Sequence, residues 1–150
     1  MNAAIAGSAL VAATILGLLL GFGRRHGTLW QPLNVSAHAL IGERAEGVFG
    51  FQSDVTLVGV AVVLVMSAVA ACVTAMLISS RRFLYRAMTV TGVVLSAYLV
   101  HLHIVARTPG GLAALLDVGE LRALYVAVAI ALMSGMRYAF SDSAGASLKT

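Results

Sequence analysis

The sequence predicts an all-α integral membrane protein, with four transmembrane helices in an antiparallel bundle and a short interfacial helix in the long first loop. Hydrophobic residues make up 60% of the 150 residues, charged residues only 11%, and the mean hydropathy is +0.95. Water-soluble domains contain roughly 45–50% apolar and about 25% charged residues. The composition therefore excludes an ordinary soluble domain, and we expect the lipid bilayer to be the main partner of this chain.

Four apolar stretches are long enough to cross a bilayer, which takes about 20 helical residues. They cover about residues 3–22, 55–79, 87–106 and 121–140 of a single membrane domain, 1–150. The first two stretches contain no charged residue, and the fourth has Arg122 and Arg137 near its ends, where long side chains reach the headgroups. No basic segment precedes the first stretch, so we interpret it as a retained span and not as a secretory signal.

The first loop, residues 24–54, is long enough to contain structure of its own. After Pro32, the apolar residues of one helical face are Leu33, Ala37, Leu40 and Ile41, and Gly42 follows as a stop. We therefore expect a short helix on the membrane surface. Trp30, Phe49 and Phe51 are predicted to anchor it at headgroup depth.

The remaining connections are shorter. Residues 80–86 form a basic hairpin, Thr108-Pro109-Gly110-Gly111 breaks the chain before one further interfacial turn, and residues 141–150 are a small polar tail. With four spans, both termini and the hairpin lie on one side. Lysine and arginine divide five against five between the two sides. The cluster of Arg81, Arg82 and Arg86 favours cytoplasmic termini, with dual insertion as the alternative.

Small residues recur every four positions in three of the predicted spans. The stripes are Ala9, Ala13, Gly17 and Gly21; Ser67, Ala71 and Ala75; and Ala123, Ala127, Ala131, Gly135 and Ala139. Association in lipid depends on close backbone packing, for which small residues are needed. We predict that these stripes are helix-packing surfaces, either inside one subunit or against a partner, and that leucine at position 17 or 135 weakens assembly.

The four histidines, His26, His38, His101 and His103, fall on the loop-rich side of the predicted topology. Histidine ligates transition metals and haem iron, so they form a possible ligand or polar cluster. His101 and His103 are about 200° apart around a helix, however, and cannot both face one metal without distortion. Polar packing is the simpler interpretation, with Tyr98 as a neighbour for His101. Cys72, the single cysteine, is interpreted as a small packing residue.

The element Trp30-x-Pro32-x-Asn34-x-x-x-His38, followed by Gly42 and a membrane span, resembles a group of small uncharacterised bacterial four-helix membrane proteins. The similarity covers about residues 29–75. That group often has histidine and tryptophan in its second helix, where this chain has an apolar sequence. The resemblance implies a location in the bacterial inner membrane and carries no activity.

The functional hypothesis is a non-catalytic membrane protein that acts by helix contact, as an accessory subunit of a larger complex or as a self-associating scaffold, without a cofactor. Two alternatives remain open: a metal- or haem-binding protein that uses the histidines, and a small passive channel. The spans contain no central acidic residue, which argues against proton-coupled transport. Basic residues are scattered at the helix ends, which argues against nucleic-acid binding.

Overall fold

The computed structural model describes residues 2–45, 47–78, 82–103 and 112–146, and throughout these ranges every regular element is a helix. Four of the helices are long: α1 (Asn2–Arg25), α4 (Ser53–Leu77), α5 (Phe83–His103) and α7 (Val118–Ala146). Each is long and apolar enough to cross a membrane. The prediction of an all-helical chain with four such helices is confirmed.

The long helices differ at their ends from the predicted spans. α7 continues to Ala146, so the first residues of the predicted polar tail are helical. Residues 141–146 contain no proline, and adding a turn to an existing helix is far easier than starting one. α4 begins at Ser53, two residues early, with Asp54 in its first turn, where a carboxylate favours the helix dipole. The predicted break at residues 108–111 lies outside the described residues.

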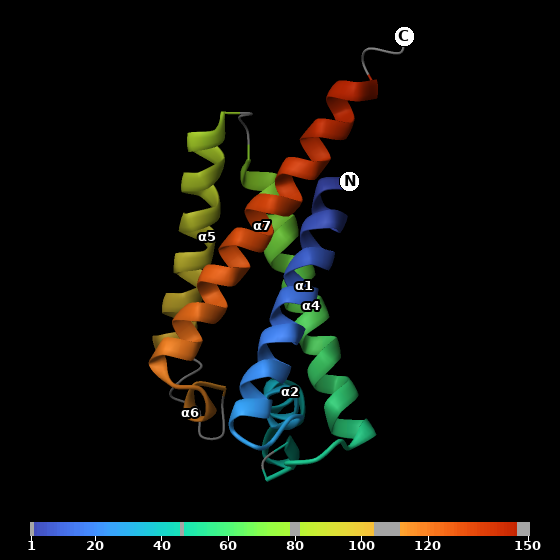
Figure 1. Cartoon of the computed structure of the whole chain (residues 1–150), viewed down its shortest axis with the longest axis vertical. Helices are drawn as coiled ribbons and strands as arrows, with labels where there is room; N and C mark the ends of the chain where they lie inside the picture. The colour runs from blue at the N-terminus through green and yellow to red at the C-terminus, as the bar shows by residue number, and fades with distance from the viewer. Residues whose placement is uncertain (1, 46, 79–81, 104–111, 147–150) are drawn as a thin grey trace.

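The four long helices alternate in direction (Figure 1). α1 and α5 run towards the end that holds the short helices, and α4 and α7 run back, so both termini lie at the opposite end. α7 crosses the molecule obliquely: it lies beside α5 where it begins and beside α1 near the termini. α1 packs against both α4 and α7 and is the central helix of the structure.

The core follows these contacts. One cluster, which includes Val11, Ala71, Val90 and Leu132, joins all four long helices, and a second cluster around Leu19 lies nearer the loops. α5 is the least enclosed long helix: only 11% of its most apolar 18-residue segment is buried, against 28% to 39% in the other three long helices. It therefore stands at the edge of the structure, held mainly by α7.

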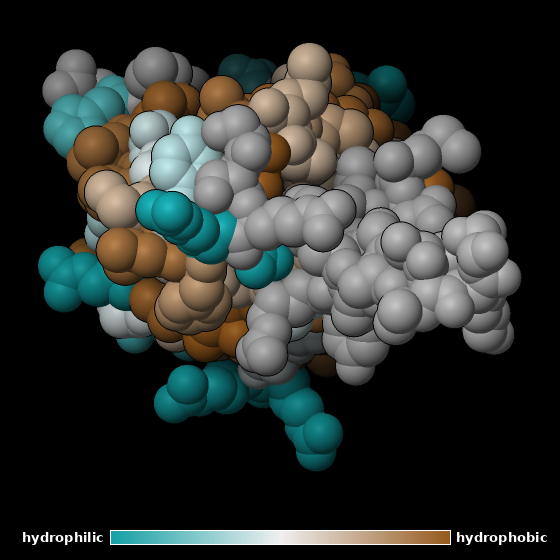
Figure 2. Space-filling model, turned by 90° about the horizontal axis from the view of Figure 1, so that it is seen from above, coloured by the Kyte–Doolittle hydropathy of each residue, from teal (hydrophilic) through white to brown (hydrophobic). Residues whose placement is uncertain are grey.

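Large apolar side chains remain exposed along the long helices. Met76 is 85% exposed, Leu84 71% and Ile130 62%. Seen from the end with the termini, hydrophobic residues cover much of the described surface, and hydrophilic residues form separate groups, some at the rim and some within this face (Figure 2). Soluble monomers rarely expose apolar surface on this scale.

The loop after α1 folds into α2 (Gln31–Ser36), α3 (His38–Ile41) and the 3-10 helix η1 (Gly42–Ala45). The single helix expected after Pro32 is interrupted because the turn tightens at Ala37, whose amide donates to the Asn34 carbonyl three residues back. Leu33 and Ala37 are buried as that helical face predicts, but Leu40 is 70% exposed. Gly42 ends α3 with a φ of 58°, a conformation that glycine adopts readily.

Candidate functional site

Two long helices, α1 and α7, come into backbone contact at a pair of glycines. A Cβ built on Gly135 would lie 2.5 Å from the Cα of Gly7, and one built on Gly7 would lie 3.2 Å from the Met136 side chain. Only glycine at position 135 permits this backbone contact. Of the predicted small-residue positions, Gly135 thus packs inside the subunit, whereas its neighbour Gly7 belongs to no predicted stripe.

The predicted stripe on α1 faces outward. Its four residues, Ala9, Ala13, Gly17 and Gly21, are all exposed. A Cβ at Gly17 or Gly21 would meet no atom within 4 Å. Inside the subunit, α1 uses the opposite face, with Gly7, Val11 and Leu19 buried. These residues are two positions from the stripe, or about 200° around the helix.

The other two stripes are divided between inside and outside. In α4, Ser67 and Ala71 are buried and Ala75 is half-buried. In α7, Ala123 is exposed, Ala127 is half-buried, and Ala131 and Gly135 are buried. The side chain of Ala139 lies outside the described residues. These two stripes therefore pack largely within the chain.

Two further glycines hold the short helices against the long ones. Gly23 of α1 lies against the carbonyl of Leu29, and Gly59 of α4 lies against the carbonyl of Leu33, so closely that a Cβ at either position would overlap the oxygen. Neither contact was predicted from the sequence. The glycines themselves were the available signal. Glycine destabilises the interior of a helix, so its presence there can indicate that another segment of backbone comes close.

The buried side chain of Asn34 ties the loop to α4. Its Nδ2 donates to the carbonyls of Val48 (2.8 Å) and Gly50 (2.9 Å), and its Oδ1 accepts from the Thr56 hydroxyl (2.6 Å). Thr56 Oγ1 in turn accepts from the amide of Gln52, at the start of α4. Asn34 has no exposed surface. The conspicuous Pro-x-Asn element thus provides a hydrogen-bonded cap over one end of the structure.

A second tie joins the end of α1 to the start of α7. His26 Nε2 lies 2.9 and 3.1 Å from the two carboxylate oxygens of Glu120, which is 8% exposed. Asp117 and Glu120 also form a capping box: the Glu120 amide donates to Asp117 Oδ1 (2.7 Å), and the Asp117 amide donates to Glu120 Oε2 (3.3 Å). The carboxylate therefore both caps α7 and binds the histidine.

The other three histidines have different surroundings and do not form a cluster. His101 Nδ1 lies 3.0 Å from the Tyr125 hydroxyl, and His103 Nδ1 lies 2.9 Å from the Leu99 carbonyl of its own helix. The expected neighbour of His101, Tyr98, instead packs its ring edge-on against Tyr125, at a centroid distance of 5.2 Å. His38 begins α3 and is half-buried. Across the described part of the chain, no three His, Cys, Asp or Glu side chains form a group that could hold a metal ion.

The predicted interfacial anchors lie together in part. Trp30 is half-buried and packs edge-on against Phe51, at a centroid distance of 5.1 Å, while Phe49 and Phe51 are each 57% exposed. Cys72 was interpreted as a packing residue, but it faces outward from α4. Ser67 and Ala71, which precede it, occupy the inward face instead.

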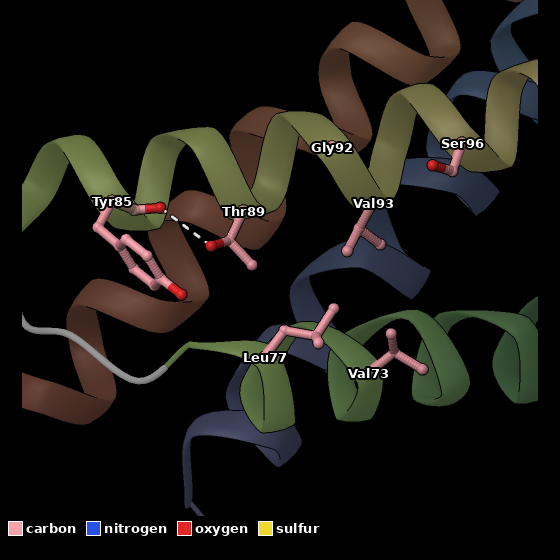
Figure 3. A pocket seen from close by; sticks show the side chains of 7 residues that line it. All are labelled: Val73, Leu77, Tyr85, Thr89, Gly92, Val93 and Ser96. Carbon is pink, nitrogen blue, oxygen red and sulfur yellow. Dashed lines mark hydrogen bonds between the residues drawn. The ribbon is translucent and has the colours of Figure 1, made fainter.

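An open groove of about 580 Å³ separates α4 from α5 (Figure 3). Val73 and Leu77 of α4 face Tyr85, Thr89 and Val93 of α5 across it. The Thr89 hydroxyl donates its hydrogen to the Tyr85 carbonyl of its own helix (3.0 Å). The groove is thus a mainly apolar opening on the side of the molecule, well away from the short helices.

Comparisons of the chain with protein families, with characterised proteins and with solved structures find no match. The resemblance of residues 29–75 to small bacterial membrane proteins accordingly stays a prediction.

Proposed function

We propose that this chain is a non-catalytic, multi-pass protein of the bacterial inner membrane that works by helix contact, as an accessory subunit of a membrane complex or as a self-associating scaffold. The four long apolar helices support membrane insertion. In this arrangement both termini are cytoplasmic, and the short helices lie on the opposite side.

The observation that carries the proposal is the outward stripe of α1. α1 is the central helix, and its inner face is already occupied by α4 and α7. Its outer face still presents Ala9, Ala13, Gly17 and Gly21, with open space over both glycines. Small residues let a second helix come close enough for backbone packing, which is what stabilises helix association in lipid.

A matched pair of substitutions tests the contact. Ala13→Leu enlarges the stripe, whereas Ala61→Leu makes the same change at another exposed alanine, on α4. Self-association is measured by energy transfer between labelled copies in liposomes, and assembly with other subunits by quantitative co-purification from native membranes. We expect Ala13→Leu to weaken either self-association or assembly with other subunits about tenfold, or ~1.4 kcal/mol. Equal behaviour of both variants would refute the contact proposal.

Membrane insertion is tested separately with Cys72, which is exposed at the surface of the isolated chain. In a bilayer, acyl chains cover this position. A water-soluble maleimide should therefore leave Cys72 unmodified in intact membranes and modify it after denaturation. The control is Glu43→Cys in a Cys72→Ser background, at an exposed loop position. Equally rapid labelling at positions 72 and 43 in open membrane fragments would contradict the span.

A further inference from the structure

A second groove lies between α5 and α7, with apolar walls and the Arg122 side chain at one end. Its volume is about 330 Å³. Val94 and Leu95 of α5 and Val126 and Ala129 of α7 line its length, and Arg122 lines it near the start of α7. Arg122 and Ala129 are seven residues apart, so the groove follows α7 for roughly 10 Å from its polar end.

The Arg122 side chain lies at the end of this groove and takes no part in the ion pair of the neighbouring loop. Glu120, two residues earlier, binds His26 just after the end of α1 and accepts from the Asp117 amide directly before α7. Arg122 is exposed and forms no ion pair with any residue that the structure describes. The positive charge of Arg122 thus lies beside one end of the groove, unpaired by any described carboxylate.

We propose that this groove binds an anionic phospholipid, with its phosphate at Arg122 and one acyl chain along α5 and α7. The inference rests on the proposed membrane insertion, which puts the start of α7 at headgroup level. An arginine there attracts anionic headgroups by about 1 kcal/mol. The apolar walls extend ~10 Å inward, over most of the roughly 15 Å that a chain crosses in one leaflet.

The rings of Tyr98 and Tyr125 form the wall one turn below Arg122. Their edge-on contact joins α5 to α7 and holds the groove walls in place at the depth where aromatic residues are enriched in membrane proteins. The bound lipid fills a space that α5, the least enclosed helix, leaves open. It therefore acts as part of the packing between α5 and α7.

The test is native mass spectrometry of the full-length protein purified in a neutral detergent, with phosphatidylglycerol and phosphatidylcholine of identical acyl chains added in equal amounts. We expect wild type to retain one phosphatidylglycerol preferentially. Arg122→Gln should reduce that preference about fivefold, equivalent to ~1 kcal/mol. Arg122→Lys should keep most of it. Arg24→Gln, an exposed arginine in the last turn of α1, is the matched control and should change nothing.

A further variant, Ala129→Leu, fills the groove beyond the charge and should reduce retention of both lipids. Circular dichroism and thermal unfolding of each variant establish that it is folded. Equal retention of the two lipids by wild type, or equal losses in Arg122→Gln and Arg24→Gln, would overturn the proposal. Unchanged retention by Ala129→Leu would place the lipid elsewhere and overturn it too. Failure of membrane insertion is scored independently by the Cys72 labelling.

Discussion

Gly135 of α7 lies directly against Gly7 of α1, with space for hydrogen atoms but not for a methyl group at position 135. Gly17, on the outer face of α1, has open space above it. The same substitution at these two glycines therefore has different physical consequences, although both belong to small-residue stripes in the sequence.

We predict that Gly135→Ala destabilises the folded chain by about 1–3 kcal/mol, because the methyl group forces α1 and α7 apart. Gly17→Ala should leave stability unchanged or raise it by up to ~1 kcal/mol, since alanine is the better helix former. Unfolding in mixed detergent micelles, followed by circular dichroism, measures both. Equal stability of the two variants would contradict the α1 and α7 contact.

Leucine at these positions separates folding from assembly. Gly135→Leu should reduce the stability of the subunit itself, whereas Gly17→Leu should leave it folded and weaken only its contact with a partner. Thermal unfolding reports the first effect, and energy transfer between copies or co-purification reports the second. A destabilised Gly17→Leu subunit would show that the stripe packs internally.

Asn34→Leu is expected to destabilise the chain by about 3 kcal/mol, because three buried hydrogen bonds are lost at roughly 1 kcal/mol each. Ser36→Ala serves as the control in the same helix, since the Ser36 hydroxyl donates only to the Pro32 carbonyl of its own turn (2.8 Å). Its effect should be within about 0.5 kcal/mol. Faster proteolysis of residues 47–52 in Asn34→Leu membranes would add local evidence that the loop has detached from α4.

Tyr125→Phe should cost about 1 kcal/mol, because the hydrogen bond to His101 is lost while the ring contact with Tyr98 is kept. Tyr98→Phe keeps the same ring contact and leaves the His101 bond intact, so we expect a smaller effect. Thermal unfolding of both variants measures the difference. If Tyr98→Phe is the more damaging, the hydrogen bond assigned to Tyr125 is wrong.

A double-mutant cycle measures the tie between α1 and α7 at the loop end. His26→Ala and Glu120→Gln, alone and together, should show a coupling of roughly 1 kcal/mol or less, because the histidine is 40% exposed and solvent weakens the pair. Glu120→Gln alone retains a side-chain oxygen for the Asp117 amide, so the cap of α7 survives. Strict additivity of the two substitutions would refute the pair.

The number and approximate position of the long helices were predictable because each contains a nearly uninterrupted apolar run. The rotation of each helix about its own axis could not be predicted. α1 is apolar on all sides, so hydrophobicity does not distinguish the face that carries Gly7 from the face that carries Gly17. Regular four-residue spacing pointed to the outer face, whereas the inner face depends on only two glycines, Gly7 and Gly23, far apart in the helix.

The polar contacts depend on tertiary structure and were harder still to predict. His26 and Glu120 are 94 residues apart in the chain, and Tyr125 and His101 come from different helices. The Asp117-x-x-Glu120 spacing is typical of a helix cap and could be recognised in the sequence. The pairing of Glu120 with His26 could not. Asn34 was noticed as part of a motif, and only the fold shows that its three partners are Val48, Gly50 and Thr56.

The sparse packing of α5 has a consequence for biogenesis. While the chain is being synthesised, α4 offers α5 few contacts, and the helix that holds α5 best, α7, is made only after α5. In the proposed membrane arrangement, α5 therefore has few helix contacts until α7 is added, and the partly synthesised chain is exposed to quality-control proteases. Termination of translation before α7 should therefore give a short-lived product, although that product already contains the three other long helices.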